Sequence, residues 1–230
     1  MDNTDPFTDL LGVIDTLLGE GGCSWDKKQT HESLKPSILE ESYEVIDAIG
    51  SNNKDYLCEE LGDLLFLILL NCKISEKSGF FNHNDCLRNV KDKMVYRHPH
   101  VFLKSAALSD GEVLENWDLL KRKEKGYAGE ADLIKNLPKA LPALYKASKV
   151  SKRLVKNCPN DFNMGMLFEE FKNRWDSLKT SVFSGNSIDA ENIGILFFIL
   201  VTISAEYDIN AEFALTNAIE TYINKFGSYK

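Results

Sequence analysis

The sequence predicts an all-α protein. In segment after segment, apolar residues recur three and four positions apart, the spacing that places them on one face of a helix. Polar or glycine-containing breaks separate these segments. No segment combines strand-like alternation with a hairpin turn, so a sheet is not expected.

The N-terminal segment predicts one helix followed by a loop. Apolar residues at helical spacing mark a helix from Phe7 to Leu18, which stops at the glycine-rich stretch Gly19 to Gly22. The polar loop after it contains Trp25. Thr30 or Ser33, near the end of this loop, can cap the next helix.

A pair of amphipathic segments between Leu39 and Asn71 forms the centre of the first half. They flank the polar break Gly50 to Asp55, whose length is typical of the connection between two antiparallel helices. The second helix of the pair is expected to continue to about Lys77, just before a glycine.

Two further helices complete the first half. Asn82 or Asn84 can cap a helix from Asp85 to about Tyr96, and the His-Pro-His sequence after it ends the helix because proline disfavours helix in the residue before it. A loop is expected at Ser105 to Gly111, followed by a helix from Val113 to Lys125.

The second half repeats the frame of the first. After a hinge at Gly126 to Glu130, four helices are predicted at Ala140–Val155, Met166–Val182, Asp189–Ala205 and Ala211–Phe226. Glu59 to Phe66 recurs as Glu191 to Phe198, with the glycine and the apolar positions retained. We therefore predict two tandem helical domains, at residues 1–126 and 127–230.

Composition narrows the function. The chain has 230 residues and a net charge of −8, so it lacks the basic surface of a general nucleic-acid binder. Its five cysteines include no CxxC pair, which favours reduced thiols in a cytoplasmic protein. No signal peptide is expected, and the longest apolar run, Ile193 to Ser204, is too short to span a membrane.

Four carboxylates gather on the central helix pair. Glu41 and Glu44 share a face of the first helix, and Glu60 and Asp63 share a face of the second. Carboxylates at close range repel one another, and protons, Lys or Arg side chains, or divalent cations can neutralise them. Oxygen-only ligands suit Mg²⁺, with Mn²⁺ as a second option. A solvated acidic face is the alternative, but Asp63 adjoins the apolar run Leu64 to Leu67, which we expect to be buried.

Basic and aromatic residues near these helices complete a possible phosphate site. Lys93, Arg97 and Lys121 can contact phosphate oxygens, and Trp25 and Trp117 can stack on a nucleobase. Taken singly, each basic residue is more typical of a solvated surface charge than of a phosphate contact. Trp117 is equally consistent with ordinary core packing.

The second repeat lacks the acidic set. In register with Glu41, Glu44, Glu60 and Asp63, it places other residues, namely Arg174, Ser177, Asn192 and Ile195. The second half is therefore expected to serve packing or dimerisation instead of chemistry.

An ordered set of motifs resembles the MazG-type nucleoside triphosphate pyrophosphohydrolases. The set comprises Cys23 to Leu34, Glu40-Glu41-x-x-Glu44, Glu60-x-x-Asp63, Arg97 to Phe102, Asn116 to Lys125 and Leu137 to Leu144. The similarity spans nearly the whole chain, and the first half is its specific part.

The resemblance implies a fold, a reaction and roles for particular residues. It implies a dimeric all-α enzyme that uses Mg²⁺ to hydrolyse a nucleoside triphosphate to the monophosphate and pyrophosphate. Metal ligands would be Glu41, Glu44, Glu60 and Asp63. Nucleotide contacts would come from Lys93, Arg97, Trp117 and Lys121, with Trp25 as a further substrate-binding residue. Glu40 would orient or activate water.

Two other functions remain open from the residues. One is a weakly active or inactive nucleotide-binding regulatory dimer, which the altered second repeat favours. The other is a redox dimetal carboxylate protein, but such bundles use Glu-x-x-His pairs, and the acidic helices contain none.

Overall fold

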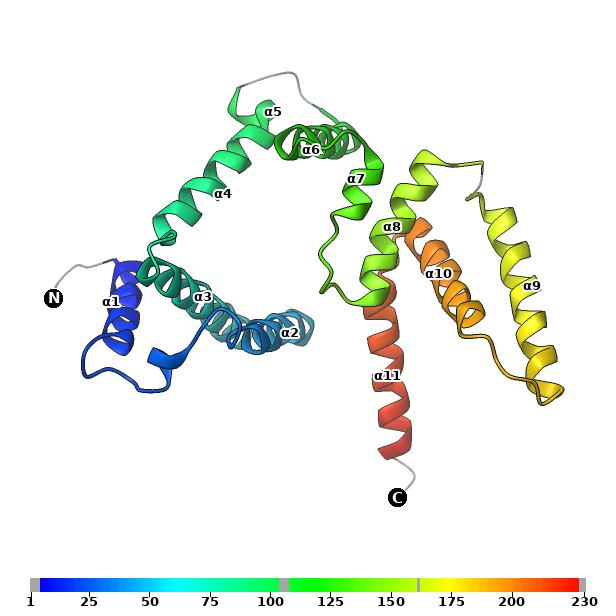
Figure 1. Ribbon diagram of the computed structural model, residues 1–230, viewed down its shortest axis with the longest axis horizontal. Coiled ribbons are helices and arrows are strands. Elements are labelled where there is room, and N and C mark those ends of the chain that lie inside the picture. The colour runs from blue at the N-terminus through cyan, green and yellow to red at the C-terminus, as the bar shows by residue number, and fades with distance from the viewer. Residues whose placement is uncertain (1–4, 104–107, 161, 228–230) are drawn as a thin grey trace. The chain divides into compact units, whose positions relative to one another are not determined.

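Helices are the only regular elements in the described residues of the computed structural model, which are 5–103, 108–160 and 162–227 (Figure 1). The predicted all-α class is confirmed. The chain divides after Glu112 into two compact units. The division of the sequence repeats at residues 1–126 and 127–230 stays a prediction.

The first unit is built on a long central helix. Its elements are α1 (Pro6–Leu18), the 3₁₀ helix η1 (Asp26–Lys28), α2 (Lys35–Ser51), α3 (Lys54–Lys77), α4 (His83–Arg97) and α5 (Pro99–Phe102). Helices α1, α2 and α4 all pack against α3. Buried side chains of α1, the α2 entry and α3 form the core, namely Ile14, Leu18, Leu34, Leu67, Leu69 and Leu70.

Asparagine side chains set the starts of α3 and α4. Asn53 accepts hydrogen bonds from the backbone N–H groups of Asp55 and Tyr56. Asn82, one of the two caps that the sequence offers, begins α4 and forms a capping box with Asp85. The break between α2 and α3 is only two residues long, shorter than predicted, because Asn52 adopts a left-handed conformation with φ 55° that turns the chain sharply.

Three predicted boundaries are wrong. Neither Thr30 nor Ser33 caps α2, which starts at Lys35 without a side-chain cap, because these two residues hydrogen-bond to each other in the preceding turn. The helix predicted from Val113 begins earlier, at Asp110, so Asp110 and Gly111 of the predicted loop are helical. The first part of that loop falls within residues 104–107, outside the described residues. The predicted hinge leads into an unpredicted short helix that begins at Glu130.

The second unit is organised around α10. Its elements are α6 (Asp110–Lys125), which begins just before the unit boundary, α7 (Glu130–Lys135), α8 (Ala143–Asn157), α9 (Met164–Phe183), α10 (Ala190–Glu206) and α11 (Ala211–Gly227). Helices α8, α9 and α11 pack against α10. Its buried face consists of Leu196, Ile199, Val201, Thr202 and Ala205. The four helices predicted for the second half are confirmed to within a few residues.

Within the described residues, no single helix is long and apolar enough to cross a membrane. Helices α10 and α11 meet the length and composition test only when taken together, and the chain bends by 107° between them.

Candidate active site

The α2–α3 hairpin brings three carboxylates together. One carboxylate oxygen each of Glu41, Glu60 and Asp63 lies within 4.8 Å of the other two. Glu44, the fourth predicted ligand, is joined to the cluster by a side-chain hydrogen bond with Glu60. The two-residue turn is what allows the acidic turns of α2 and α3 to face each other.

Glu60 is the buried member of this acidic cluster, with 7% of its surface exposed. Burial, the hydrogen bond with Glu44 and the nearby negative charges raise the pKa of Glu60 from 4.5 to about 7. The pKa of Glu41 is also raised, first by burial and then by the charges of Glu44, Asp63 and Glu40. Removing these carboxylates from water is therefore unfavourable unless protons or a cation neutralise them.

The donor set fits a divalent cation. All the converging ligands are carboxylate oxygens, the type that hard divalent ions prefer. One oxygen each of Glu41 and Glu60, Oε2, is buried without a hydrogen-bond partner among the described residues. Buried polar atoms normally have a partner, so a bound ion would complete the bonding of both oxygens.

The burial of the site differs from the prediction in one respect. Asp63 is exposed, and the apolar run beside it is only partly covered. Leu67 is buried, whereas Leu65 is exposed. The expectation that the whole run is buried is wrong because only one face of α3 packs against α1 and the α2 entry.

Two residues next to the cluster take part in its electrostatics. Glu40 is exposed on α2, and its charge contributes to the raised pKa of Glu41. Tyr56, which the sequence reasoning missed, is half-buried one turn before Glu60. Its pKa is raised by burial and then by the charges of Glu60 and Glu44, among others. The i, i+4 spacing of Tyr56 and Glu60 was the available sequence signal.

The predicted nucleotide contacts are spread over several elements. Lys93 lies on α4, and Arg97, at the end of α4, is only 7% exposed. Trp25 is 62% exposed in the loop before η1. Trp117 and Lys121 lie on α6, within the second unit. The roles of these five residues stay a prediction.

The histidines near the site make local structural bonds. His31 bonds through Nδ1 to Oδ1 of Asn71 at 2.9 Å and through Nε2 to Oγ of Ser75 at 3.2 Å, which ties the entry of α2 to α3. His98 Nδ1 lies 2.6 Å from the carbonyl oxygen of Met94. Both histidines therefore have a structural role in their surroundings.

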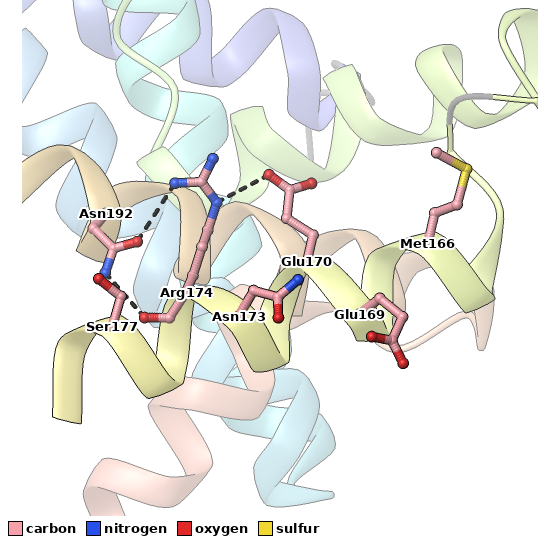
Figure 2. A pocket seen from close by; sticks show the side chains of 7 residues that line it. All are labelled: Met166, Glu169, Glu170, Asn173, Arg174, Ser177 and Asn192. Carbon is pink, nitrogen blue, oxygen red and sulfur yellow. Dashed lines mark hydrogen bonds and ion pairs between the residues drawn. The ribbon is translucent and has the colours of Figure 1, made fainter. Parts of the chain in front are cut away.

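The matching place in the second unit holds a different set of side chains (Figure 2). Nε of Arg174 donates to Glu170 Oε1 at 2.9 Å, and Nη1 of Arg174 donates to Asn192 Oδ1 at 3.4 Å. The amide nitrogen of Asn192 donates to the carbonyl oxygen of Arg174 at 3.1 Å. Arg174 and Asn192 therefore pair across α9 and α10 as Glu41 and Glu60 pair across α2 and α3, which supports the register of the repeat.

Comparisons with known proteins find a matching family model and several similar proteins. A family model described as the MazG nucleotide pyrophosphohydrolase domain matches residues 29–102, which contain the whole acidic cluster. A nucleoside triphosphate pyrophosphohydrolase of Escherichia coli strain K12 is 34% identical over 223 residues, covering 94% of this chain and 84% of that protein. The nucleoside triphosphate pyrophosphohydrolase/pyrophosphatase MazG of Thermotoga maritima is 31% identical over 220 residues, covering 96% and 84%.

A third relative matches only part of its own length. The uncharacterized protein YabN of Bacillus subtilis is 44% identical over 146 residues, which cover 64% of this chain and 30% of that protein. The chain therefore spans most of the E. coli and T. maritima relatives but less than a third of YabN.

Proposed function

The chain belongs to the MazG family of nucleoside triphosphate pyrophosphohydrolases, and we propose that its first unit hydrolyses nucleoside triphosphates to a monophosphate and pyrophosphate. The observation that supports this most is the group of carboxylate oxygens of Glu41, Glu60 and Asp63 within 4.8 Å of one another. We propose nucleotide-pool housekeeping as the general role of this activity.

We assign the metal-binding role to Glu41, Glu44, Glu60 and Asp63, and Mg²⁺ as the ion, with Mn²⁺ as a substitute. Mg²⁺ keeps several waters and binds through carboxylates and substrate phosphates, which suits a cluster with one exposed side. When bound, such an ion lowers the pKa of a water ligand and offsets phosphate charge.

The chain's own residues supply the remaining functions in this proposal. Glu40, exposed beside the cluster, takes the proton from the water that attacks the α-phosphorus. Lys93, Arg97 and Lys121 stabilise the negative charge on the departing pyrophosphate. Trp25 and Trp117 hold the nucleobase by stacking. The reaction consumes one water and needs no covalent enzyme intermediate.

We further propose that the protein works as a homodimer. Both units leave matching helix faces exposed, with apolar residues at equivalent repeat positions: Leu65 and Phe197, Ile68 and Leu200, Leu87 and Ile219. Repeated exposure of large apolar side chains on helix faces is typical of surfaces that a partner covers.

The position of bond cleavage tests the reaction. Hydrolysis in ¹⁸O-labelled water with Mg²⁺ should place the label in the nucleoside monophosphate and release unlabelled pyrophosphate. Label in orthophosphate would mean attack at the γ-phosphorus and would contradict the proposal. Absence of turnover with all common, deoxy and oxidised triphosphates would favour the regulatory binding protein instead.

A further inference from the structure

A pocket in the second unit stands where the first unit has its acidic cluster. It has a volume of about 480 Å³ and is lined by Met166, Glu169, Glu170, Asn173, Arg174, Ser177 and Asn192 (Figure 2). In the repeat, the positions of Glu40, Glu41, Glu44 and Glu60 are filled by other residues, namely Asn173, Arg174, Ser177 and Asn192. Four carboxylates are thus replaced by two amides, a hydroxyl and a guanidinium.

This exchange reverses what the site can bind. Each replacing side chain offers hydrogen-bond donors, whereas ionised carboxylates only accept. Ile195 occupies the position of Asp63, so the second site has lost that metal ligand as well. Among the described residues, no group of three metal-ligating side chains gathers in the second unit.

The guanidinium of Arg174 is held in place while part of it stays available. Its Nε donates a hydrogen bond to Glu170 Oε1, and its Nη1 donates one to Asn192 Oδ1. Its Nη2 has no protein partner among the described residues. Asn173 and Ser177, on the same helix, also line the pocket (Figure 2). Both residues are exposed, and their side chains have no hydrogen-bond partner in the described part of the chain. Each of these three pocket-lining side chains therefore has a donor without a protein acceptor among the described residues.

We propose that this pocket binds a phosphoryl group directly, without a divalent cation. Arginine forms strong charge-assisted hydrogen bonds with phosphate oxygens, and neutral amide and hydroxyl donors add to them. In the proposed function of the first unit, the carboxylates would hold a cation that offsets phosphate charge. In the second unit the guanidinium of Arg174 would supply this positive charge itself. Pyrophosphate and nucleoside monophosphates both present this group.

Glu170 opposes binding and so provides a sharp test. Its carboxylate accepts a hydrogen bond from Arg174 and repels an incoming phosphate. Glu169 also lines the pocket, but its side chain points away from Arg174 (Figure 2). Removing the charge of Glu170 should therefore strengthen phosphate binding, whereas a purely structural Arg174–Glu170 pair predicts no gain.

Calorimetric titration of the full chain in EDTA tests the proposal independently of the first unit's metal site. Pyrophosphate, AMP and adenosine are the probes. Wild type should bind pyrophosphate or AMP, and the relative affinity shows which of the two is preferred. Adenosine, which lacks a phosphoryl group, should not bind. Arg174→Gln should weaken binding by about tenfold or more, and Glu170→Gln should tighten it.

Lys172→Gln is the matched control for Arg174→Gln. It also removes one positive charge, but from an exposed position of α9 outside the pocket. Its affinity should equal that of wild type. Arg174→Lys, which keeps the charge but not the planar fork, should bind with intermediate affinity and guards against misfolding of Arg174→Gln. The proposal is overturned if wild type binds neither phosphate probe in EDTA, or if Arg174→Gln binds as wild type does.

Discussion

The surroundings of Glu60 change the pKa of its side chain. It is buried, it hydrogen-bonds to another carboxylate, and its pKa is raised to about 7. An isolated carboxyl group would be ionised at neutral pH. The arrangement of the cluster therefore favours a proton or a cation beside Glu60 at neutral pH.

Stability of the metal-free protein should fall as the pH rises through neutrality. The folded chain holds the Glu60 proton with a pKa of about 7 against an ordinary 4.5, so the stabilisation is complete below about pH 4.5 and is lost as the pH passes 7. Melting temperatures in EDTA at pH 5.5 and 8 measure this fall. The melting temperature of Glu60→Gln should fall less between these two pH values. An unchanged fall would show that Glu60 is not the group responsible.

Asp63→Asn separates function from folding at the same cluster. Asp63 is exposed, and its charge raises the pKa of Glu41, so its removal relieves repulsion. The melting temperature should stay near or above that of wild type. Turnover should fall by roughly 100-fold or more, because even the outer partners of metal ligands are worth about 10–100-fold. Full activity of this variant would disprove a metal role for Asp63.

Helices α3 and α10 have matching buried apolar faces but different residues on their polar faces. In α3 the residues aligned with Asn192 and Ile195 are Glu60 and Asp63, whereas the apolar positions Leu67 and Ile199 are buried in both helices. The buried face is the common feature because each helix organises its own unit. The two polar faces differ because their residues are not part of that buried core.

The effect of a substitution in α10 on stability should therefore depend on whether the residue lies on the buried or the exposed face. Ile199 is 2% exposed, so Ile199→Ala should reduce the free energy of unfolding by roughly 2–5 kcal/mol. Glu191 is exposed in the first turn, so Glu191→Gln should cost less than about 1 kcal/mol and leave turnover within a few-fold. Denaturant unfolding and turnover assays measure both. Loss of activity in Glu191→Gln with an intact fold would reveal a second catalytic site.

The exposed apolar faces give a prediction for the whole molecule. Ile68 is exposed on α3, and its equivalent Leu200 is exposed on α10. Ile68→Lys should weaken the proposed dimer by at least about tenfold, because a buried unpaired charge at an interface is unfavourable. Val13→Lys, on the exposed face of α1, is the control and should leave association unchanged. Sedimentation velocity distinguishes a dimer from a monomer, and a wild-type monomer at all concentrations would rule the dimer out.

Much of the architecture follows from local sequence alone. The positions of α3 and of the four principal helices of the second half follow from helical spacing, and the Asn82 cap from short-range chemistry. The acidic hairpin was predictable for the same reason, because residues three and four apart share a helix face whatever packs around them. The loss of the acidic set in the second repeat is likewise visible in the sequence.

Only the tertiary structure decided which carboxylates are buried and how they pair. Sequence treats Glu60 and Asp63 alike, yet Glu60 is buried and Asp63 is exposed. Spacing also cannot show that both Glu41 and Glu44 bond to Glu60. Nor can it show that Asp63 joins Glu41 and Glu60 in the three-oxygen group. Burial and pairing depend on the neighbouring helix and on the two-residue turn that sets its register. Local periodicity contains no information about that neighbour, because the contacts that fix it join residues far apart in the chain.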